Sequence, residues 1–227
     1  MSEVRDNLAS VGGRIEAACK RAGRDPASVQ LVAVSKLQPL EKLRAALVAG
    51  QRVFGENYAQ ELREKADALR GEVGSLASPE WHFLGALQTN KVKLVVGRAA
   101  LVHTVDRLAL AAEIGKRAAA SGLVQRVLLE VNVGGEPQKA GAVAEELPKL
   151  IDQIRGLGSL RLEGLMCIPP ADGEPRRHFA RLRTLNEQHR AGPHLSMGMS
   201  EDFETAIEEG ATLVRVGTAV FGARPTS

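Results

Sequence analysis

Residues 29–50 read VQLVAVSKLQPLEKLRAALVAG and contain the repeating unit of this chain. The apolar run VQLVAVS (29–35) predicts a β-strand, and PLEKLRAALVAG (39–50) predicts a helix that ends at Gly50. Lys36 lies between them, where the strand ends. A lysine there can be a solvated strand cap, or an amine held in the mouth of a barrel for chemistry. The rest of the sequence decides between these.

Seven more strand-like runs follow, and helical segments separate them. The runs cover residues 52–56, 80–86, 100–106, 124–132, 160–168, 194–200 and 212–222, the last of which also starts a short helix. The helical segments cover residues 58–69, 89–96, 107–122, about 141–155, about 174–190 and 201–210. This alternation favours parallel strands joined by crossover helices, and eight units predict an α/β fold closed into a TIM-like (β/α)8 barrel. An open doubly wound sheet is the structural alternative.

An additional helix is expected before the first strand. Val4, Leu8, Val11, Ile15 and Cys19 recur at spacings of three and four, which is typical of one face of an amphipathic helix. We expect this helix to plug or cover one end of the barrel. No linker-like tract of Pro, Gly and Ser divides the chain, so residues 1–227 are expected to form a single barrel domain.

Composition narrows the classes of function. Aromatic residues make up 3% of the 227 residues and the net charge is +3, without a dense basic run. Charges are interleaved in EKLRAAL and ELREKADALR, a pattern typical of solvated helix faces, so a nucleic-acid partner is not expected. Cys19 and Cys167 are far apart and predict neither a zinc site nor a disulfide. The chain shows no signal-peptide core or membrane-spanning run, so we expect a cytoplasmic protein without a membrane partner.

The working face of such a barrel lies at the carboxyl ends of its strands. Gly217 and Thr218 follow the last strand, and the SMGMS turn (196–200) follows the seventh. Glycine allows close approach of the backbone to an anion, and hydroxyl groups add donors. The two turns therefore predict a phosphate site, although each alone is common in ordinary loops.

Arg215 stands within the apolar run TLVRVG, where alternation places it on the same face as Leu213 and Gly217. A buried arginine is costly unless it is paired. It is therefore expected to meet an anion, a carboxylate or a ligand atom, with a structural ion pair as the alternative. A lysine opposite a phosphate site can form a Schiff base with a carbonyl. Lys36 is thus compatible with an aldolase-like enzyme, a phosphosugar enzyme or a pyridoxal phosphate protein, and the spacing does not separate these.

The chain as a whole resembles a known family. The segments that carry the resemblance are LVAVSK (31–36), FGENYAQE (54–61), WHFLGALQTNK (81–91), HTVDR (103–107), VNVGGEPQKAG (131–141), LEGLMCIPP (162–170) and LSMGMSEDFETAIEEGATLVRVGTAVFG (195–222). They are similar to those of the pyridoxal phosphate homeostasis proteins, also called proline synthetase co-transcribed homologues. The fold of that family is similar to the N-terminal barrel domain of alanine racemase.

The resemblance implies a cofactor site. It implies that Lys36 carries pyridoxal 5'-phosphate as a Schiff base and that Arg215 lies near the pyridine ring. It also implies that the phosphate is surrounded by Ser196, Ser200, Gly217 and Thr218, and that the pocket is lined by Asn57, His82 and Met166. His82 could instead be an ordinary histidine at a strand end. Asn90, Lys91 and Lys139 match family positions, and Lys139 is a candidate second landing place for the cofactor.

The function implied is reversible storage of the cofactor rather than turnover. We expect a protein that buffers and carries pyridoxal phosphate for vitamin B6 homeostasis, with no catalytic residues, with apoenzymes as possible recipients, and as a monomer. A weak racemase-like enzyme is the alternative. An arginine at the ring nitrogen makes the cofactor a poor electron sink, because arginine does not exchange its proton. In the related racemase a second base comes from a tyrosine of an extra C-terminal domain, which this chain is expected to lack; its one tyrosine is Tyr58. A barrel that binds another phosphorylated carbonyl compound is a further, non-catalytic alternative.

Overall fold

Eight parallel strands form a closed barrel in the order in which they occur in the chain, which confirms the predicted (β/α)8 architecture. The computed structural model describes residues 2–70, 78–136, 138–171 and 173–223. The strands are β1 (Gln30–Val34), β2 (Val53–Glu56), β3 (Glu80–Phe83), β4 (Ala99–Val105), β5 (Gln125–Glu130), β6 (Leu160–Met166), β7 (His194–Ser196) and β8 (Leu213–Val216). Pairing of β8 with β1 closes the ring, which excludes the open sheet.

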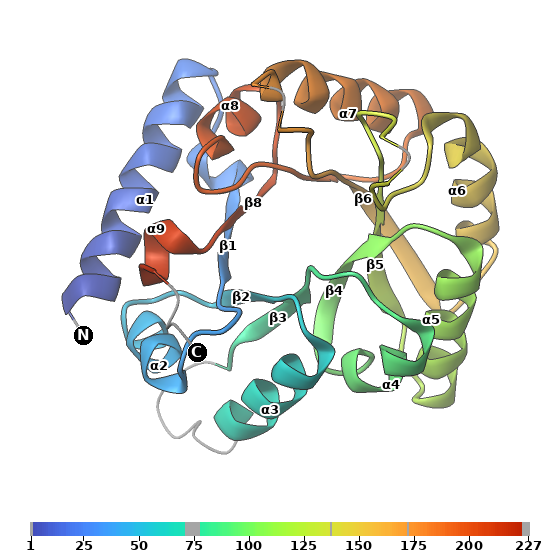
Figure 1. The fold of residues 1–227 in the computed structure, drawn as a ribbon, viewed down its shortest axis with the longest axis horizontal. Helices are drawn as coiled ribbons and strands as arrows, with labels where there is room; N and C mark the ends of the chain where they lie inside the picture. Colours follow the sequence, from blue (N-terminus) through green and yellow to red (C-terminus); the bar gives the residue numbers. More distant parts are fainter. Residues whose placement is uncertain (1, 71–77, 137, 172, 224–227) are drawn as a thin grey trace.

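Helices surround the barrel (Figure 1). They are α1 (Ser2–Arg21), α2 (Leu40–Val48), α3 (Ala59–Arg70), α4 (Val92–Val95), α5 (Leu108–Ala120), α6 (Leu147–Arg155), α7 (Pro175–His189), α8 (Phe203–Glu208) and α9 (Thr218–Phe221). Three 3₁₀ turns accompany them at Pro26–Ser28, Thr89–Lys91 and Ala144–Glu146. The helix expected over 141–155 begins only at Leu147, with a proline in its first turn, where a missing N–H costs nothing.

The strand expected over 194–200 is shorter in the structure and ends at Ser196. Gly198 adopts a φ of +91°, outside the range of a β-strand. A Cβ at this position would come within 2.5 Å of the Ala206 side chain, so only glycine fits there. The residues after Ser196 therefore belong to the loop that leads into α8.

Each strand separates two apolar layers, because successive side chains point to opposite faces. The interior of the barrel holds a cluster that includes Val32, Leu101, Leu128, Met166 and Leu213. The outer layer between strands and helices is larger, and its strand residues include Ala33, Val102, Val127, Leu165, Val214 and Val216. The alternation predicted for the last strand is confirmed, since Leu213 lies inside and its neighbour Val214 lies outside.

Helix α1 lies alongside the barrel rather than across its end, so the expectation that it plugs or covers an end was wrong (Figure 1). It packs on α2, α8 and α9, and Asn7 Nδ2 donates a hydrogen bond to Val220 O at 3.0 Å. The reason is that α9, which follows β8, is only four residues long. Helix α1 thus covers the part of the wall that this short helix leaves open.

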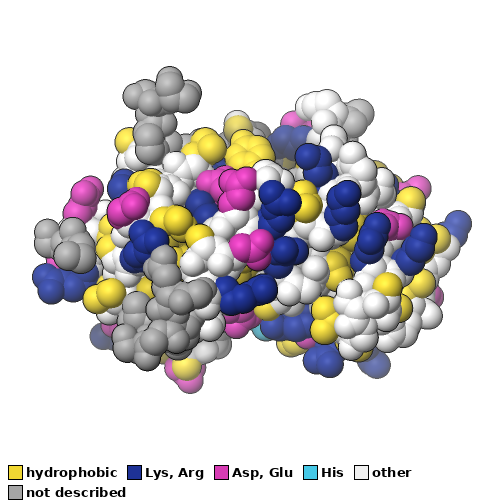
Figure 2. Space-filling model, turned by 90° about the horizontal axis from the view of Figure 1, so that it is seen from below, with side chains coloured by type: hydrophobic (Ala, Val, Ile, Leu, Met, Phe, Trp, Pro, Cys, Tyr) yellow, Lys and Arg dark blue, Asp and Glu magenta, His cyan; other side chains and the backbone are white. Residues whose placement is uncertain are grey.

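The surface carries mixed charge. Figure 2 shows Lys and Arg side chains spread over one face of the molecule, with Asp and Glu side chains between them. Within the described parts of the chain, no helix combines the length and apolar character needed to cross a lipid bilayer.

Candidate functional site

A cavity of about 360 Å³ opens at the carboxyl ends of the strands. Six of the residues expected at a cofactor site line it: Lys36, Asn57, Ser200, Arg215, Gly217 and Thr218. The lining is completed by Val34, Gln38, Leu84, Ile168, Met199, Glu201, Asp202 and Gly222, which sequence patterns did not single out. The volume lies within the range of small-molecule sites. These residues come from strands, loops and a helix start that are far apart in the chain, and only closure of the barrel brings them together.

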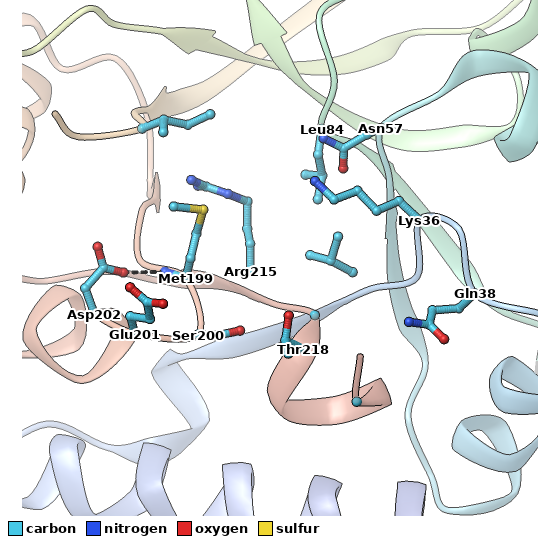
Figure 3. Close-up of a pocket in the computed structure, with 14 residues that line it drawn as sticks. Lys36, Gln38, Asn57, Leu84, Met199, Ser200, Glu201, Asp202, Arg215 and Thr218 are labelled. Atoms are coloured by element: carbon cyan, nitrogen blue, oxygen red, sulfur yellow. Dashed lines mark hydrogen bonds between the residues drawn. The ribbon is translucent and has the colours of Figure 1, made fainter. Parts of the chain in front are cut away.

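The lysine amine and the arginine guanidinium of the cavity come from different parts of the barrel. Lys36 follows β1 and Arg215 belongs to β8, and Figure 3 shows both side chains extending into the same space. Asn57, which follows β2, lies beside the end of the Lys36 side chain in this view. The cavity thus offers a nucleophilic amine next to a fixed positive charge, which suits a ligand that carries both a carbonyl and an acceptor atom.

The part of the cavity formed by the loop after β7 and the start of α9 is rich in hydrogen-bond donors. Ser200 and Thr218 contribute hydroxyl groups, and Gly217 leads into α9, whose first N–H groups have no acceptor within the helix. The SMGMS loop is held against β8 by a hydrogen bond from Arg215 N to Gly198 O at 3.0 Å. Donors of this kind suit an anion such as a phosphate.

Arg215 is buried, with 5% of its surface exposed, and its partners are neutral. Its Nη1 donates to Ser196 Oγ at 2.7 Å and its Nη2 donates to Cys167 O at 2.9 Å. No carboxylate within the described ranges forms an ion pair with it, so the structural ion pair is not found there. Burial lowers the pKa of this guanidinium below its usual range. Because both hydrogen-bond partners of Arg215 are neutral, its positive charge stays available to an acceptor in the cavity.

Three expected site residues do not line the cavity that holds Lys36: His82, Met166 and Ser196 are buried beneath it in the barrel interior. Met166 belongs to the interior apolar cluster. Ser196 Oγ lies 2.8 Å from His103 Nδ1, and His103 Nε2 lies 3.0 Å from His82 Nδ1. That His82 and Met166 line the cofactor pocket, and that Ser196 lies at the phosphate, therefore stay predictions, and any part these side chains have at the site lies beneath the cavity.

The two histidines connect the cavity to the opposite end of the barrel. Burial lowers the pKa of both His82 and His103, so both rings are neutral at neutral pH. The Glu80 carboxylate lies 3.1 Å from His82 Nε2 and accepts a hydrogen bond from this N–H group. His82 Nδ1 is then an acceptor, so His103 must donate to it through Nε2. His103 Nδ1 must accept a hydrogen bond from the Ser196 hydroxyl. The donors therefore point in one direction, from Arg215 to Glu80.

A second cavity of about 320 Å³ adjoins the first and shares Asn57, Leu84 and Ile168 with it. It is lined by Glu130, whose pKa is raised to about 7 by burial and by the nearby Asp106 charge. Lys139 also lines this cavity, and its Nζ pairs with Glu136 Oε2 at 2.7 Å.

The other matched positions lie elsewhere. Asn90 and Lys91 are exposed on a 3₁₀ turn and line neither cavity. Pro137, within one of the segments quoted above, lies outside the described residues.

The lining residues fit pyridoxal phosphate. The cavity combines a lysine amine, a buried guanidinium with neutral partners and a donor-rich anion site, which match the aldehyde, the ring and the phosphate of that cofactor in kind. Metal ligands are not assembled, since no group of three or more His, Cys, Asp and Glu side chains in the described ranges is placed to hold a metal ion.

Comparisons with known proteins agree with this assignment. Residues 7–225 match the family model described as alanine racemase, N-terminal domain. The pyridoxal phosphate homeostasis protein of Aquifex aeolicus is 46% identical over 227 residues, covering 96% of this chain and 97% of the relative. The structure of PipY from Synechococcus elongatus with PLP bound superposes with a TM-score of 0.80 at 37% identity, over 96% of this chain and all of the other.

An alanine racemase of Clostridium difficile shares the fold, with a TM-score of 0.75 at 14% identity over the full length of this chain and 58% of the racemase. The full-length matches, rather than this distant one, decide the relationship. From its sequence and its fold, this chain belongs to the pyridoxal phosphate homeostasis protein family.

Proposed function

We propose that this protein binds pyridoxal 5'-phosphate through Lys36 and serves to buffer and carry the cofactor rather than to catalyse a reaction. One observation carries the proposal: Lys36, Arg215 and the Gly217–Thr218 turn face one cavity of suitable volume. The homologous PipY structure is described with PLP bound, which supports the same ligand here. The chemistry that the cofactor supplies is a reversible condensation of its aldehyde with a lysine amine, in which water is released.

Each residue of the site would have its own role in binding the cofactor. Lys36 would supply the amine, Arg215 would face the ring, and Ser200, Gly217 and Thr218 would hold the phosphate through hydroxyl and backbone donors. Asn57 would orient the Lys36 side chain (Figure 3). His82, Met166 and Ser196 would act from beneath, by filling the barrel and holding Arg215 in place. Because the covalent link is reversible, occupancy follows the concentration of free cofactor, which is the property a buffer needs.

One feature favours carriage over racemisation. Racemisation needs a proton donor or acceptor on each face of the cofactor, and Tyr58 is 54% exposed and does not line the cavity. We expect no measurable interconversion of L- and D-amino acids by the purified protein. We further propose that the protein acts as a monomer and that its recipients are apoenzymes that use the same cofactor.

The test is an absorbance spectrum of the wild type and of Lys36→Ala after incubation with pyridoxal phosphate, before and after borohydride, with mass spectrometry of the digest. A reducible band and an adduct on the peptide that contains Lys36 are expected for the wild type and not for the variant. A wild-type protein that gains no band would overturn the proposal.

A separate experiment tests which residues hold the phosphate. Thr218→Val removes a hydroxyl donor without changing the size of the side chain much. It should weaken binding of pyridoxal phosphate by about tenfold and leave the affinity for pyridoxal, which has no phosphate, unchanged. Equal losses for the two ligands would place the phosphate elsewhere.

A further inference from the structure

The loop that carries Lys36 is held by a buried lysine of helix α3. Lys65 Nζ donates to Ser35 O at 2.6 Å, directly before Lys36 in the chain. The same ammonium group bonds to Glu56 Oε1 at 2.8 Å and to Glu61 Oε1 at 2.6 Å. Ser35 Oγ also donates to Glu56 Oε1, at 2.6 Å. Both the backbone and the side chain of Ser35 are therefore bonded to this group of charges.

The residue after Lys36 is anchored by the same group. Leu37 N donates to Glu61 Oε1 at 2.7 Å. Leu37 has a φ of +60°, a left-handed conformation that a leucine rarely adopts. Such a conformation persists only where surrounding contacts impose it. The bond to Glu61 is such a contact, and it lies one residue from the amine.

Two of the three charged side chains, Glu56 and Lys65, are buried at a cost, and Glu61 is partly buried. Lys65 has 6% of its surface exposed, which corrects the expectation that the charges of ELREKADALR lie on a solvated face. Glu56, at the end of β2, has none of its surface exposed. Among the described residues, the second carboxylate oxygens of Glu56 and Glu61 are buried without a hydrogen-bond partner. Burial also raises the pKa of Glu56 to about 7, against the opposing effect of Lys65. Apolar residues of similar volume could stabilise a fold as well as a buried ion pair does, so stability alone does not account for this group.

We propose that Glu56, Glu61 and Lys65 form a positioning cluster that holds the Ser35–Leu37 backbone in the conformation in which Lys36 can bind and retain the cofactor. This inference rests on the proposed function of Lys36. The three side chains touch the loop and not the ligand cavity, since none of them lines it. They are positioning residues that act through the backbone on either side of the amine.

The experiment compares Glu61→Ala, which removes the acceptor of the Leu37 N–H, with Glu61→Gln, which keeps an oxygen at that place. Hydrogen exchange of the ligand-free protein should show faster exchange at residues 35–38 for Glu61→Ala, with Glu61→Gln close to the wild type. The rate at which bound pyridoxal phosphate leaves the reloaded protein should rise about tenfold for Glu61→Ala, the effect of losing a hydrogen bond to a charged group, and Glu61→Gln should largely restore it. Lys65→Met should resemble Glu61→Ala.

Glu64→Gln serves as the matched control on the same helix, because Glu64 is exposed and bonds only to Gln60 in the described hydrogen bonds. If Lys65→Met does not fold, the comparison of Glu61→Ala with Glu61→Gln still tests the positioning role. Exchange and release rates of Glu61→Ala within about twofold of those of Glu64→Gln would overturn the positioning role. Failure of the proposed function is a different outcome: the wild type itself would then form no adduct at Lys36.

Discussion

Arg215 donates a hydrogen bond of 2.7 Å to Ser196 Oγ, and this hydroxyl links the arginine in the ligand cavity to the pair of histidines beneath it. The bond joins β8 to β7 inside the barrel. It gives the buried guanidinium a neutral partner and so leaves its charge directed at the cavity. It also means that the orientation of Arg215 depends on side chains that do not line the cavity.

Ser196→Ala should destabilise the protein by about 1–3 kcal/mol, because it leaves a buried guanidinium N–H and the His103 ring nitrogen without a partner. Urea denaturation monitored by circular dichroism measures the effect. Ser28→Ala, which removes an exposed hydroxyl, is the control and should change the free energy of unfolding by less than about 0.5 kcal/mol. Equal values for the two variants would show that the Ser196 bond contributes nothing.

The buried histidines should make the fold sensitive to acid. Burial lowers the pKa of His103 in the folded state, whereas in the unfolded chain it titrates near 6.5. Below that pH the unfolded state binds more protons, so the free energy of unfolding should decrease as the pH falls below about 6.5. In His103→Asn this decrease should be smaller. Denaturation at a series of pH values from about 5 to about 8 measures the slope for the wild type and for His103→Asn.

Glu130 should have the opposite dependence. Its folded-state pKa is raised from 4.5 to about 7, chiefly by burial. Between these values the folded state binds more protons than the unfolded state, so the free energy of unfolding should fall as the pH rises through this window and then level off. Glu130→Gln should remove about 1–3 kcal/mol of this loss. A variant whose pH profile matches that of the wild type would show that Glu130 ionises normally in the folded protein.

Gly85 allows the close approach of two strand ends at the site. A Cβ on this residue would lie 1.9 Å from Asn57 O, an impossible contact with backbone atoms. Gly85→Ala should therefore cost about 1–3 kcal/mol or more and should displace Asn57, which weakens cofactor binding. Thermal unfolding and a binding titration test the two effects. Gly13→Ala, in the exposed part of α1 with nothing near its Cβ, should instead raise stability by about 0.5–1 kcal/mol.

The sequence predicted much of the fold because the signals involved are local. Eight strand-like runs alternate with helical ones, and the structure has eight strands in a closed ring. Alternation also placed Arg215 and Val214 on opposite faces of the last strand, and in the structure Val214 lies in the outer layer and Arg215 points inward. Strand ends and glycine turns then led to the lining residues Lys36 and Thr218. Each of these inferences depends on residues within a few positions of one another.

What the sequence by itself determined is therefore the order of the elements, which residues share a face of a strand and which residues stand at the strand ends. Only the tertiary structure decided the height of each side chain within the barrel, because height depends on the register between neighbouring strands. Ser196 and His103 are 93 positions apart and meet beneath the cavity rather than at it. Lys65 appears in an ordinary charged helix sequence and becomes a buried anchor because the tertiary structure places Ser35 O, 30 positions away, 2.6 Å from its ammonium group.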